Sequence, residues 1–143
     1  MYDRILLPTD GSGGTDPAVD QAIGLATETG AELHVLFVVE DVPYAPEMTD
    51  ERVGAQLRKI GEDAIESIRE RADAAGVTLR AAIEDGVPHR EILEYADRMD
   101  VDLVVMGTHS RSGLDKYLLG SVTERVVRTA DVPVLTVRVG GDD

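Results

Sequence analysis

Two glycine-containing segments in the last third of the chain hold residue types that bind phosphate. Residues 107–113 read Gly-Thr-His-Ser-Arg-Ser-Gly, and residues 120–124 read Gly-Ser-Val-Thr-Glu. Glycine lets the backbone come close to a ligand and adopt a positive φ. Ser121 and Glu124 have the spacing of a helix capping box, which would place free N–H groups and a helix dipole beside Gly120. The spacing predicts a phosphate site, and a plain turn with a helix cap explains it equally well.

The charge of this region differs from that of the whole chain, whose net charge is −14. Four basic residues lie close together along it: Arg111, Lys116, Arg125 and Arg128. A positive segment in so acidic a chain favours an anionic ligand, whereas the overall charge repels phosphate backbones and argues against nucleic-acid binding. An acidic surface with only two lysines is typical of an acidic, halophile proteome, where salt screens the self-repulsion, and an ordinary acidic protein is the other interpretation.

The composition excludes several other kinds of site. There is no cysteine, so disulfides and thiolate metal sites are excluded, and His34, His89 and His109 lack the spacing of a zinc motif. No apolar stretch reaches the roughly 18 residues that a membrane span needs. The first ten residues lack the basic flank and apolar run of a signal peptide. We expect a cytoplasmic protein with neither a membrane nor a nucleic-acid partner.

Apolar runs alternate with helical patterns along the whole chain. Strands are predicted at residues 4–8, 32–39, 77–83, 101–106 and 132–137. Helices are predicted from Pro17 to Gly30, from Thr49 to Gly76, after Pro88 and from Ser121. Strands separated by helices pair in parallel through right-handed crossovers. The pattern therefore predicts an α/β fold with a three-layer, doubly wound, five-stranded parallel sheet and four helices, as a single domain over residues 1–143.

Particular residues define the expected helix ends and faces. Asp16 precedes Pro17 and has the residue type of an N-cap. The second helix is expected to bury one apolar stripe, formed by Val53, Leu57, Ile60, Ala64, Ile68, Ala72 and Ala75. In doubly wound sheets, ligands bind outside the carboxyl ends of the strands where the strand order reverses. The loops after the first, second and fourth strands are therefore the expected site.

Almost the whole chain, residues 1–137, resembles the universal stress protein family. The segments that carry the resemblance are residues 5–12, 106–109, 118–127 and 132–135. Nucleotide-binding members have the pattern G-x2-G-x9-G-[S/T], which falls here on Gly107, Ser110, Gly120 and Ser121, with Ser110 at the second glycine position. The resemblance implies a fold like that of the adenine nucleotide alpha hydrolases, with ATP and its Mg²⁺ as the bound cofactors.

The resemblance also implies a role for each matching position. The residues expected beside adenosine are Pro8, Thr9, Asp10, Val38 and Met106. Those expected around the ribose and phosphates are Gly107, His109, Ser110, Arg111, Gly120, Ser121 and Val122. Asp10 would lie near the ribose or a phosphate-bound magnesium. For Val38 and Met106 the other interpretation is core packing, and for Asp10 it is a turn cap.

The fifth strand has an expected role as well. In this family it pairs across a two-fold axis, which implies a homodimer through Val134, Leu135, Thr136 and Val137. An unpaired apolar edge invites aggregation, and a symmetric dimer closes it. No nucleophile–base pair stands out in the sequence, so the resemblance implies an ATP-binding stress-response regulator with at most slow ATP hydrolysis.

Other functions remain open at this stage. Ser110 favours a nucleotide-free dimer that acts as an interaction or scaffold protein. Residues 12–16 resemble the SGGxD[S/T] loop of ATP pyrophosphatases, which would make the chain an adenylating enzyme, although Pro17 replaces the expected hydroxyl residue. A flavodoxin-like or response-regulator domain shares the strand–helix count. A receiver would need a lysine at the end of the fifth strand, where this chain has Arg138.

Overall fold

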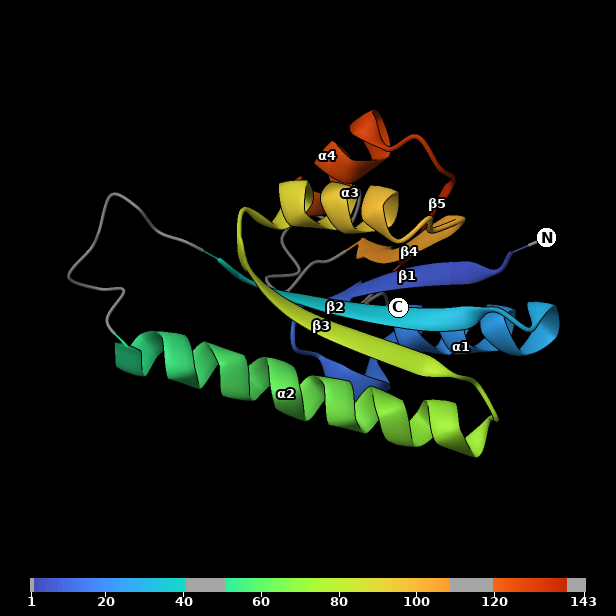
Figure 1. Ribbon diagram of the computed structural model, residues 1–143, viewed down its shortest axis with the longest axis horizontal. Coiled ribbons are helices and arrows are strands. Elements are labelled where there is room, and N and C mark those ends of the chain that lie inside the picture. The colour runs from blue at the N-terminus through green and yellow to red at the C-terminus, as the bar shows by residue number, and fades with distance from the viewer. Residues whose placement is uncertain (1, 41–50, 109–119, 139–143) are drawn as a thin grey trace.

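Five strands form the central layer of the protein in the computed structural model, which describes residues 2–40, 51–108 and 120–138 (Figure 1). The strands are β1 (Arg4–Thr9), β2 (Glu32–Glu40), β3 (Leu79–Gly86), β4 (Leu103–Thr108) and β5 (Val134–Arg138). Their order is β3-β2-β1-β4-β5, and every neighbouring pair is parallel. The prediction of a doubly wound parallel sheet is confirmed, and the strand order reverses between β1 and β4.

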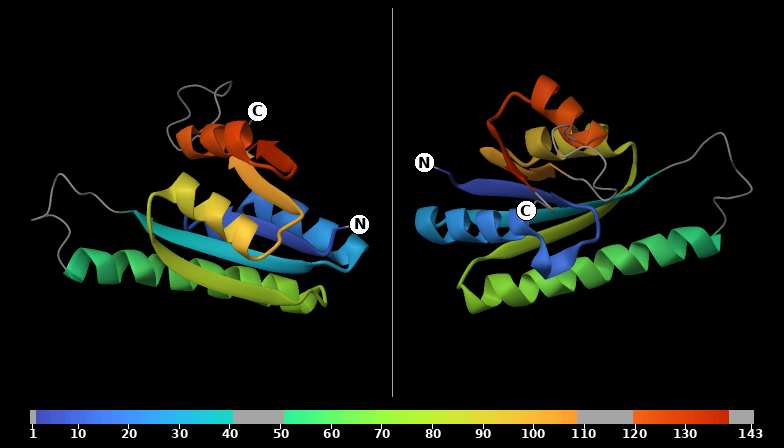
Figure 2. Two further views of the ribbon diagram at one scale, coloured as in Figure 1. Left: turned by 45° about the horizontal axis from the view of Figure 1, so that its top comes forward. Right: turned by 180° about the vertical axis from the view of Figure 1, so that it is seen from behind.

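Four helices cover the two faces of this sheet in the described part of the chain. They are α1 (Pro17–Thr29), α2 (Glu51–Ala74), α3 (Pro88–Arg98) and α4 (Ser121–Thr129), and a short 3-10 turn, η1 (Gly13–Thr15), precedes α1. Helices α1 and α2 lie on one face and α3 and α4 on the other (Figures 1 and 2). Within the described ranges, none of the helices has the length and apolar run that crossing a membrane takes.

Each face of the sheet has its own apolar cluster. Leu33, Val35 and Phe37 of β2 belong to the cluster under α1 and α2. Leu36, between them in sequence, belongs to the cluster under α3 and α4. Alternate residues of a strand point to opposite faces, so a strand covered on both faces is apolar at nearly every position. This explains the continuous apolar run of β2.

The predicted ends of α1 are confirmed. Asp16 is the N-cap, and its carboxylate accepts a hydrogen bond from the backbone N–H of Ala18 at 2.8 Å. Pro17 occupies the first helical position, where its missing N–H costs nothing. Gly30 ends the helix in the left-handed conformation, with φ of 73°. These local signals fix where α1 begins and ends, and hence where the connection from β1 must arrive.

Strands β3, β4 and β5 begin two residues later than the sequence predicts. Val77 and Val101 are buried, but their backbone N–H groups donate to Ala72 and Ala96 in the preceding helices, at 2.8 and 2.9 Å. This is the arrangement of Schellman-type helix ends, in which an apolar residue after the helix packs back onto its last turns. Val77 and Val101 therefore serve the helix ends, and β3 and β4 start after them.

The expected apolar stripe of α2 is wrong in its first half and at its last residue. Ala64, Ile68 and Ala72 are buried as predicted. Val53 and Ile60 are 39% and 48% exposed, and Ala75 is exposed and follows the end of the helix. The amino-terminal half of α2 extends past the carboxyl edge of the sheet, so that part has no strand to cover (Figure 1). Gly61 is buried instead and lies directly against the ring of Phe37. A Cβ atom at this position would clash with that ring. A glycine is needed for this close approach of helix to strand.

Candidate functional site

A cavity of about 700 Å³ opens at the carboxyl edge of the sheet, where β1 and β4 diverge. This is the position that doubly wound sheets use for ligands. Its lining comes from the ends of β1, β2 and β4, from the connection between β1 and α1, and from the first turns of α3 and α4. The predicted location of the site therefore coincides with the cavity in the structure.

The sequence-predicted site residues that the structure describes all line this cavity. They are Pro8, Thr9, Asp10, Val38, Met106, Gly107, Gly120, Ser121 and Val122. His109, Ser110 and Arg111 lie outside the described residues. The fold brings together segments that are far apart in sequence, because β1 and β4 are neighbours in the sheet, where Ile5 pairs with Leu103. What each residue binds stays a prediction.

The inner part of the cavity is apolar. Leu36, Ile92 and Met106 are at most 5% exposed and belong to the core under α3 and α4, and they also line the cavity. Met106 is therefore both a core residue and part of the cavity wall. Phe37 and Leu57 line the cavity from the α2 side. A flat apolar ligand group, such as a purine base, fits walls of this kind.

The connection from β1 to α1 forms one side of the cavity, which we name the acidic wall: Asp10, Ser12 and Asp16. The Asp10 carboxylate accepts hydrogen bonds from the backbone N–H of Ser12 at 3.1 Å and from its hydroxyl at 2.5 Å. The Asp16 carboxylate caps α1. Asp10 therefore makes the local turn that its residue type indicates, and its carboxylate also borders the cavity.

The glycines of this connection turn away from the cavity. Gly13 is buried with φ of +74°, and a Cβ atom on it would lie 3.6 Å from Cβ of Ser67 in α2. The carbonyl oxygen of Gly14 accepts a hydrogen bond from the guanidinium of Arg71, also in α2. Ser12 and Asp16 line the cavity, whereas these two glycines do not. The geometry gives no support to residues 12–16 as a pyrophosphate loop of an adenylating enzyme.

The opposite side of the cavity is the glycine wall: Gly107, Gly120, Ser121, Val122 and Thr123. Gly120 is the N-cap of α4, with ψ of 153°, and as a glycine it makes no side-chain cap hydrogen bond. The first turn of α4 lines the cavity, and among the described residues its first N–H groups have no side-chain cap there. Buried Thr123 donates its hydroxyl hydrogen bond to the carbonyl oxygen of Gly107 at 2.9 Å, which fixes α4 to the end of β4.

The expected capping box at Ser121 and Glu124 is wrong. Ser121 is the first residue of α4 rather than its N-cap, so Glu124 stands one position too late to close the box. Glu124 forms an ion pair with Arg128 at 3.0 Å on the exposed surface of α4. Glycine is an acceptable N-cap because it adopts the extended conformation and leaves the N–H groups open. A glycine N-cap has no side chain of its own to compete for those groups, which favours the anion-binding interpretation.

The charges at the cavity are arranged asymmetrically. Asp10, Asp16 and Glu40 are among the lining residues, and the described lining includes no lysine, arginine or histidine. His89, next to the lining residue Pro88, has a pKa below its usual range because it is partly buried and because Arg125 and Arg90 are nearby. A neutral imidazole at this rim adds little positive charge. Positive potential on the described surface of the cavity comes from the amino end of α4.

Oxygen ligands for a cation are present at one side of the cavity. Carboxylate and hydroxyl oxygens of Asp10, Asp16 and Ser12 have the hard donor chemistry that Mg²⁺ prefers. The described residues include no cluster of three or more histidine, aspartate or glutamate side chains that could hold a metal ion by itself. A magnesium ion that brings its own phosphate ligands fits this donor set, because Mg²⁺ in nucleotide sites needs only one or two protein carboxylates.

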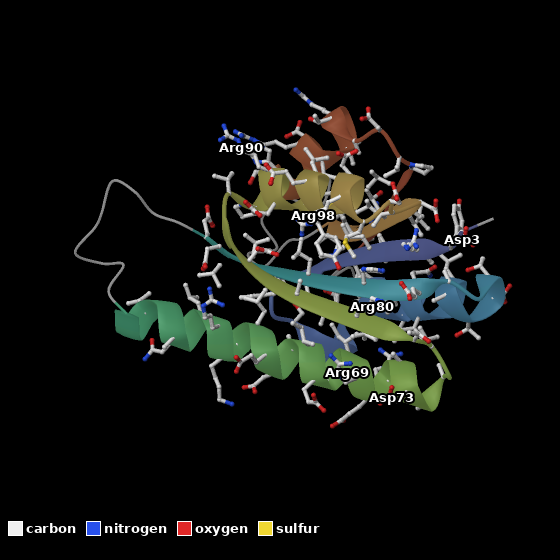
Figure 3. All side chains as sticks on the ribbon, in the orientation of Figure 1. Asp3, Arg69, Asp73, Arg80, Arg90 and Arg98 are labelled. Atoms are coloured by element: carbon white, nitrogen blue, oxygen red, sulfur yellow. The ribbon has the colours of Figure 1, made fainter. Side chains whose placement is uncertain are left out.

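His34 lies outside the site and has a structural role. It is fully buried in β2, where its Nε2–H donates to the Glu32 carboxylate at 3.0 Å. With the proton on Nε2, its Nδ1 accepts from the Tyr95 hydroxyl at 2.7 Å. Arg80 holds the same carboxylate at 3.1 Å (Figure 3). The hydrogen bond from His34, and then that from Arg80, lower the pKa of Glu32 below its usual range.

Several cavity residues have no sequence signal of their own. Leu36, Phe37 and Val39 lie in the apolar run of β2, and Leu57 and Ile92 lie in helical stripes, where core packing explains each of them. Glu40 and Thr123 are ordinary polar residues at the ends of their elements. Val38 is the one residue of β2 predicted for the site, and the pairing of β2 with β1 brings its neighbours at the end of this strand to the cavity as well.

Comparison with known proteins defines the class of this fold and then the family. The sheet order and helix placement are those of the adenine nucleotide alpha hydrolase-like fold, and the family model of the universal stress proteins matches residues 1–138. The chain belongs to the universal stress protein family. It is 38% identical over 141 residues to universal stress protein MJ0531 of Methanocaldococcus jannaschii, which covers 96% of this chain and 83% of that protein.

Solved structures agree with this assignment. The structure of MJ0577, another universal stress protein of M. jannaschii, has a TM-score of 0.85 and 30% identity, with 99% of each chain covered. A universal stress protein in complex with cAMP has a TM-score of 0.69 and 29% identity, and covers 96% of this chain and 97% of that protein. The fold of this chain is therefore one on which a nucleotide complex has been solved.

Proposed function

We propose that the protein binds ATP, together with Mg²⁺, in the cavity between the acidic wall and the glycine wall. The observation that carries this proposal is the convergence of Asp10, Val38, Met106, Gly107 and Gly120 on one cavity at the reversal of strand order. The cAMP complex of a relative supports an adenine nucleotide as the class of ligand.

The walls suggest how the ligand lies. The adenine base would occupy the apolar part, against Met106 and the backbone of Val38, where dispersion and burial favour an aromatic group. The phosphates would accept hydrogen bonds from the first N–H groups of α4, beside Gly120 and Ser121. A bound Mg²⁺ would bridge the phosphates to Asp10, offsetting the repulsion between two anionic groups.

We assign the nucleotide the role of a regulatory ligand in a stress-response protein. Any hydrolysis is expected to be slow, because the sequence offers no evident nucleophile–base pair. A ligand shifts a conformational equilibrium by its difference in affinity for the two states. The cytoplasmic location and the halophile interpretation of the net charge of −14 stay predictions.

The test is direct measurement of the bound nucleotide. The protein is purified in high salt and denatured, and any released small molecule is identified by mass spectrometry. The refolded or nucleotide-free protein is then titrated calorimetrically with Mg-ATP, with Mg-GTP and adenosine as comparison ligands. Saturable ATP binding with a stoichiometry of one per chain is expected. A folded protein that binds no ATP at millimolar concentration contradicts the proposal and leaves the nucleotide-free scaffold as the better function.

We also propose that the protein forms a homodimer through β5. This strand pairs only with β4 in the described sheet, so its outer edge has unpaired backbone groups. Leu135 is 36% exposed, and Thr136 is exposed beside it. A two-fold partner strand would cover this edge.

Light scattering tests the proposed dimer. It should give twice the chain mass for the wild-type protein, and Leu135→Lys should give a folded monomer. A monomeric wild-type protein contradicts the dimer.

A further inference from the structure

The acidic wall is supported by helix α2 rather than by the sheet. Its three residues lie along the connection between β1 and α1, and the middle of that connection, η1, rests on α2 rather than on the sheet. The contact is close, since a Cβ atom on Gly14 would lie 3.0 Å from Cδ of Arg71 and 3.5 Å from the carbonyl oxygen of Ser67. The two glycines allow this approach and also leave the turn with little stiffness of its own.

Arg71 joins three elements at this contact. Its Nη1 donates to the carbonyl oxygen of Gly14 in η1, and its Nη2 donates to the carboxylate of Asp20 in the first turn of α1. Gly14 and Asp20 flank Asp16, a residue of the acidic wall, on either side. A planar guanidinium holds two acceptors in a fixed relative geometry, which a lysine ammonium does not.

We infer that Arg71 is a positioning residue for the acidic wall. It fixes the segment from Ser12 to Asp16 against α2, and it has no contact with the ligand itself, since it does not line the cavity. For its effect on affinity, the inference rests on the proposed function. Without the guanidinium, the glycine-containing turn moves relative to α2, and a ligand must order it on binding, which reduces affinity.

Loss of the Arg71 contact should reduce ligand affinity more than it reduces the free energy of unfolding. The side chain of Arg71 is 39% exposed and that of Asp20 is 61% exposed, so the ion pair between them is a surface pair of small energetic value. A matched control lies on the same helix. Arg69 is 40% exposed and forms an ion pair with Glu66 of α2 at 4.0 Å, with no link to the acidic wall (Figure 3). The two arginines therefore differ in what they hold rather than in their exposure.

The experiment compares Arg71→Ala, Arg71→Lys and Asp20→Asn with Arg69→Ala, using two measurements. The first is the ¹⁵N order parameter of the backbone amides of residues 12–16 in the nucleotide-free protein. It should fall from about 0.85, the rigid value, toward 0.6 in Arg71→Ala and stay unchanged in Arg69→Ala. The order parameter in Arg71→Lys should lie between those of the wild type and Arg71→Ala, because the ammonium holds one acceptor at a time. The melting temperatures of Arg71→Ala and Arg69→Ala should agree within a few degrees.

The second measurement is the affinity for Mg-ATP. Arg71→Ala should weaken binding by about tenfold, and Arg71→Lys and Asp20→Asn by about two- to threefold, from the added cost of ordering the turn. Order parameters that match the wild type in both Arg71→Ala and Asp20→Asn overturn the inference. A loosened turn with unchanged affinity overturns the role of Arg71 in binding.

Failure of the proposed function is distinguishable from failure of this inference. If the wild-type protein binds no nucleotide, the proposed function is wrong, and the order parameters alone decide the role of Arg71. Loosening of residues 12–16 in Arg71→Ala but not in Arg69→Ala then still supports Arg71 as the residue that holds this wall of the cavity. If Arg71→Ala does not fold, the isosteric Asp20→Asn variant supplies a milder form of the same comparison, because it keeps an oxygen acceptor but removes the charge that strengthens this hydrogen bond of the guanidinium.

Discussion

The two walls of the cavity differ in how they are built and in the charge that they present. The acidic wall consists of carboxylates and a hydroxyl, which hydrogen-bond within the connection after β1 and depend on α2 for their position. The glycine wall presents backbone N–H groups at a helix end whose N-cap is a glycine, fixed to β4 by Thr123. One wall attracts cations and the other attracts anions. A ligand that carries both charges, such as a metal-bound phosphate, satisfies the two walls at once.

The largest effect on ligand affinity is expected from a substitution in the glycine wall. Gly120→Asp should weaken Mg-ATP binding by about 100-fold or more, because a carboxylate at the N-cap accepts the N–H hydrogen bonds of α4 and repels phosphate. Aspartate is a preferred N-cap, so the melting temperature should be unchanged or higher. Titration calorimetry and thermal unfolding check the two effects separately.

Gly120→Asn is the matched control, since asparagine caps a helix equally well but carries no charge. It separates the loss of N–H groups from the added negative charge. Binding by Gly120→Asp with the affinity of the wild type would falsify the glycine wall as a phosphate site.

Removal of magnesium tests the acidic wall. ATP affinity should fall by about tenfold or more in EDTA, because Asp10, Asp16 and Glu40 then face the phosphates without a bridging cation. Adenosine has no phosphate, so its affinity should not change on chelation. The measurement is a pair of ATP titrations, one with and one without chelator in excess over the free Mg²⁺. Equal ATP affinity under both conditions means that the carboxylates do not act on the phosphates.

A smaller effect is expected where the glycine wall joins the sheet. Thr123→Val should lower the free energy of unfolding by about 1–2 kcal/mol, since it removes a buried hydrogen bond and leaves the carbonyl of Gly107 without this donor. Urea denaturation measures the change. Thr129→Val is the control, because Thr129 is exposed on the same helix and donates to the carbonyl of Arg125 at 2.7 Å. Equal losses in the two variants contradict a special role for Thr123.

The smallest effect concerns a region away from both walls. The pKa of Glu32 is lowered in the folded protein by its hydrogen bonds with His34 and Arg80, so its stabilising contribution is present above the unfolded pKa and lost as pH falls through the folded pKa. Glu32→Gln should therefore cost less than about 1 kcal/mol at pH 7 and nothing in acid below the folded pKa. ATP affinity should stay unchanged, because Glu32 begins β2 at the opposite edge of the sheet.

Denaturation of Glu32→Gln and the wild type at neutral and acidic pH provides the check. A difference in stability between the two proteins that is the same at both pH values would show that the carboxylate charge of Glu32 contributes nothing.

Much of the fold was predictable because its signals are local. Asp16, Pro17 and Gly30 fix the ends of α1 through backbone conformation and capping, which depend on a few neighbouring residues. The errors arise where two kinds of local structure, a helix end and a buried strand, both use an apolar residue. Val77 and Val101 are apolar because they close helix ends, and a sequence pattern does not distinguish this from the first residue of a buried strand.

The sequence by itself determined the alternation of strands and helices, the family, and the glycine positions of the expected phosphate site. These features depend on local periodicity and on residues close together in the chain. Only the tertiary structure decided that residue Leu57 borders the cavity, that Gly120 rather than Ser121 caps α4, and that Arg71 holds the connection after β1. Each of these depends on which distant elements are neighbours in space. That follows from the strand order and from the placement of α2, which no local pattern specifies.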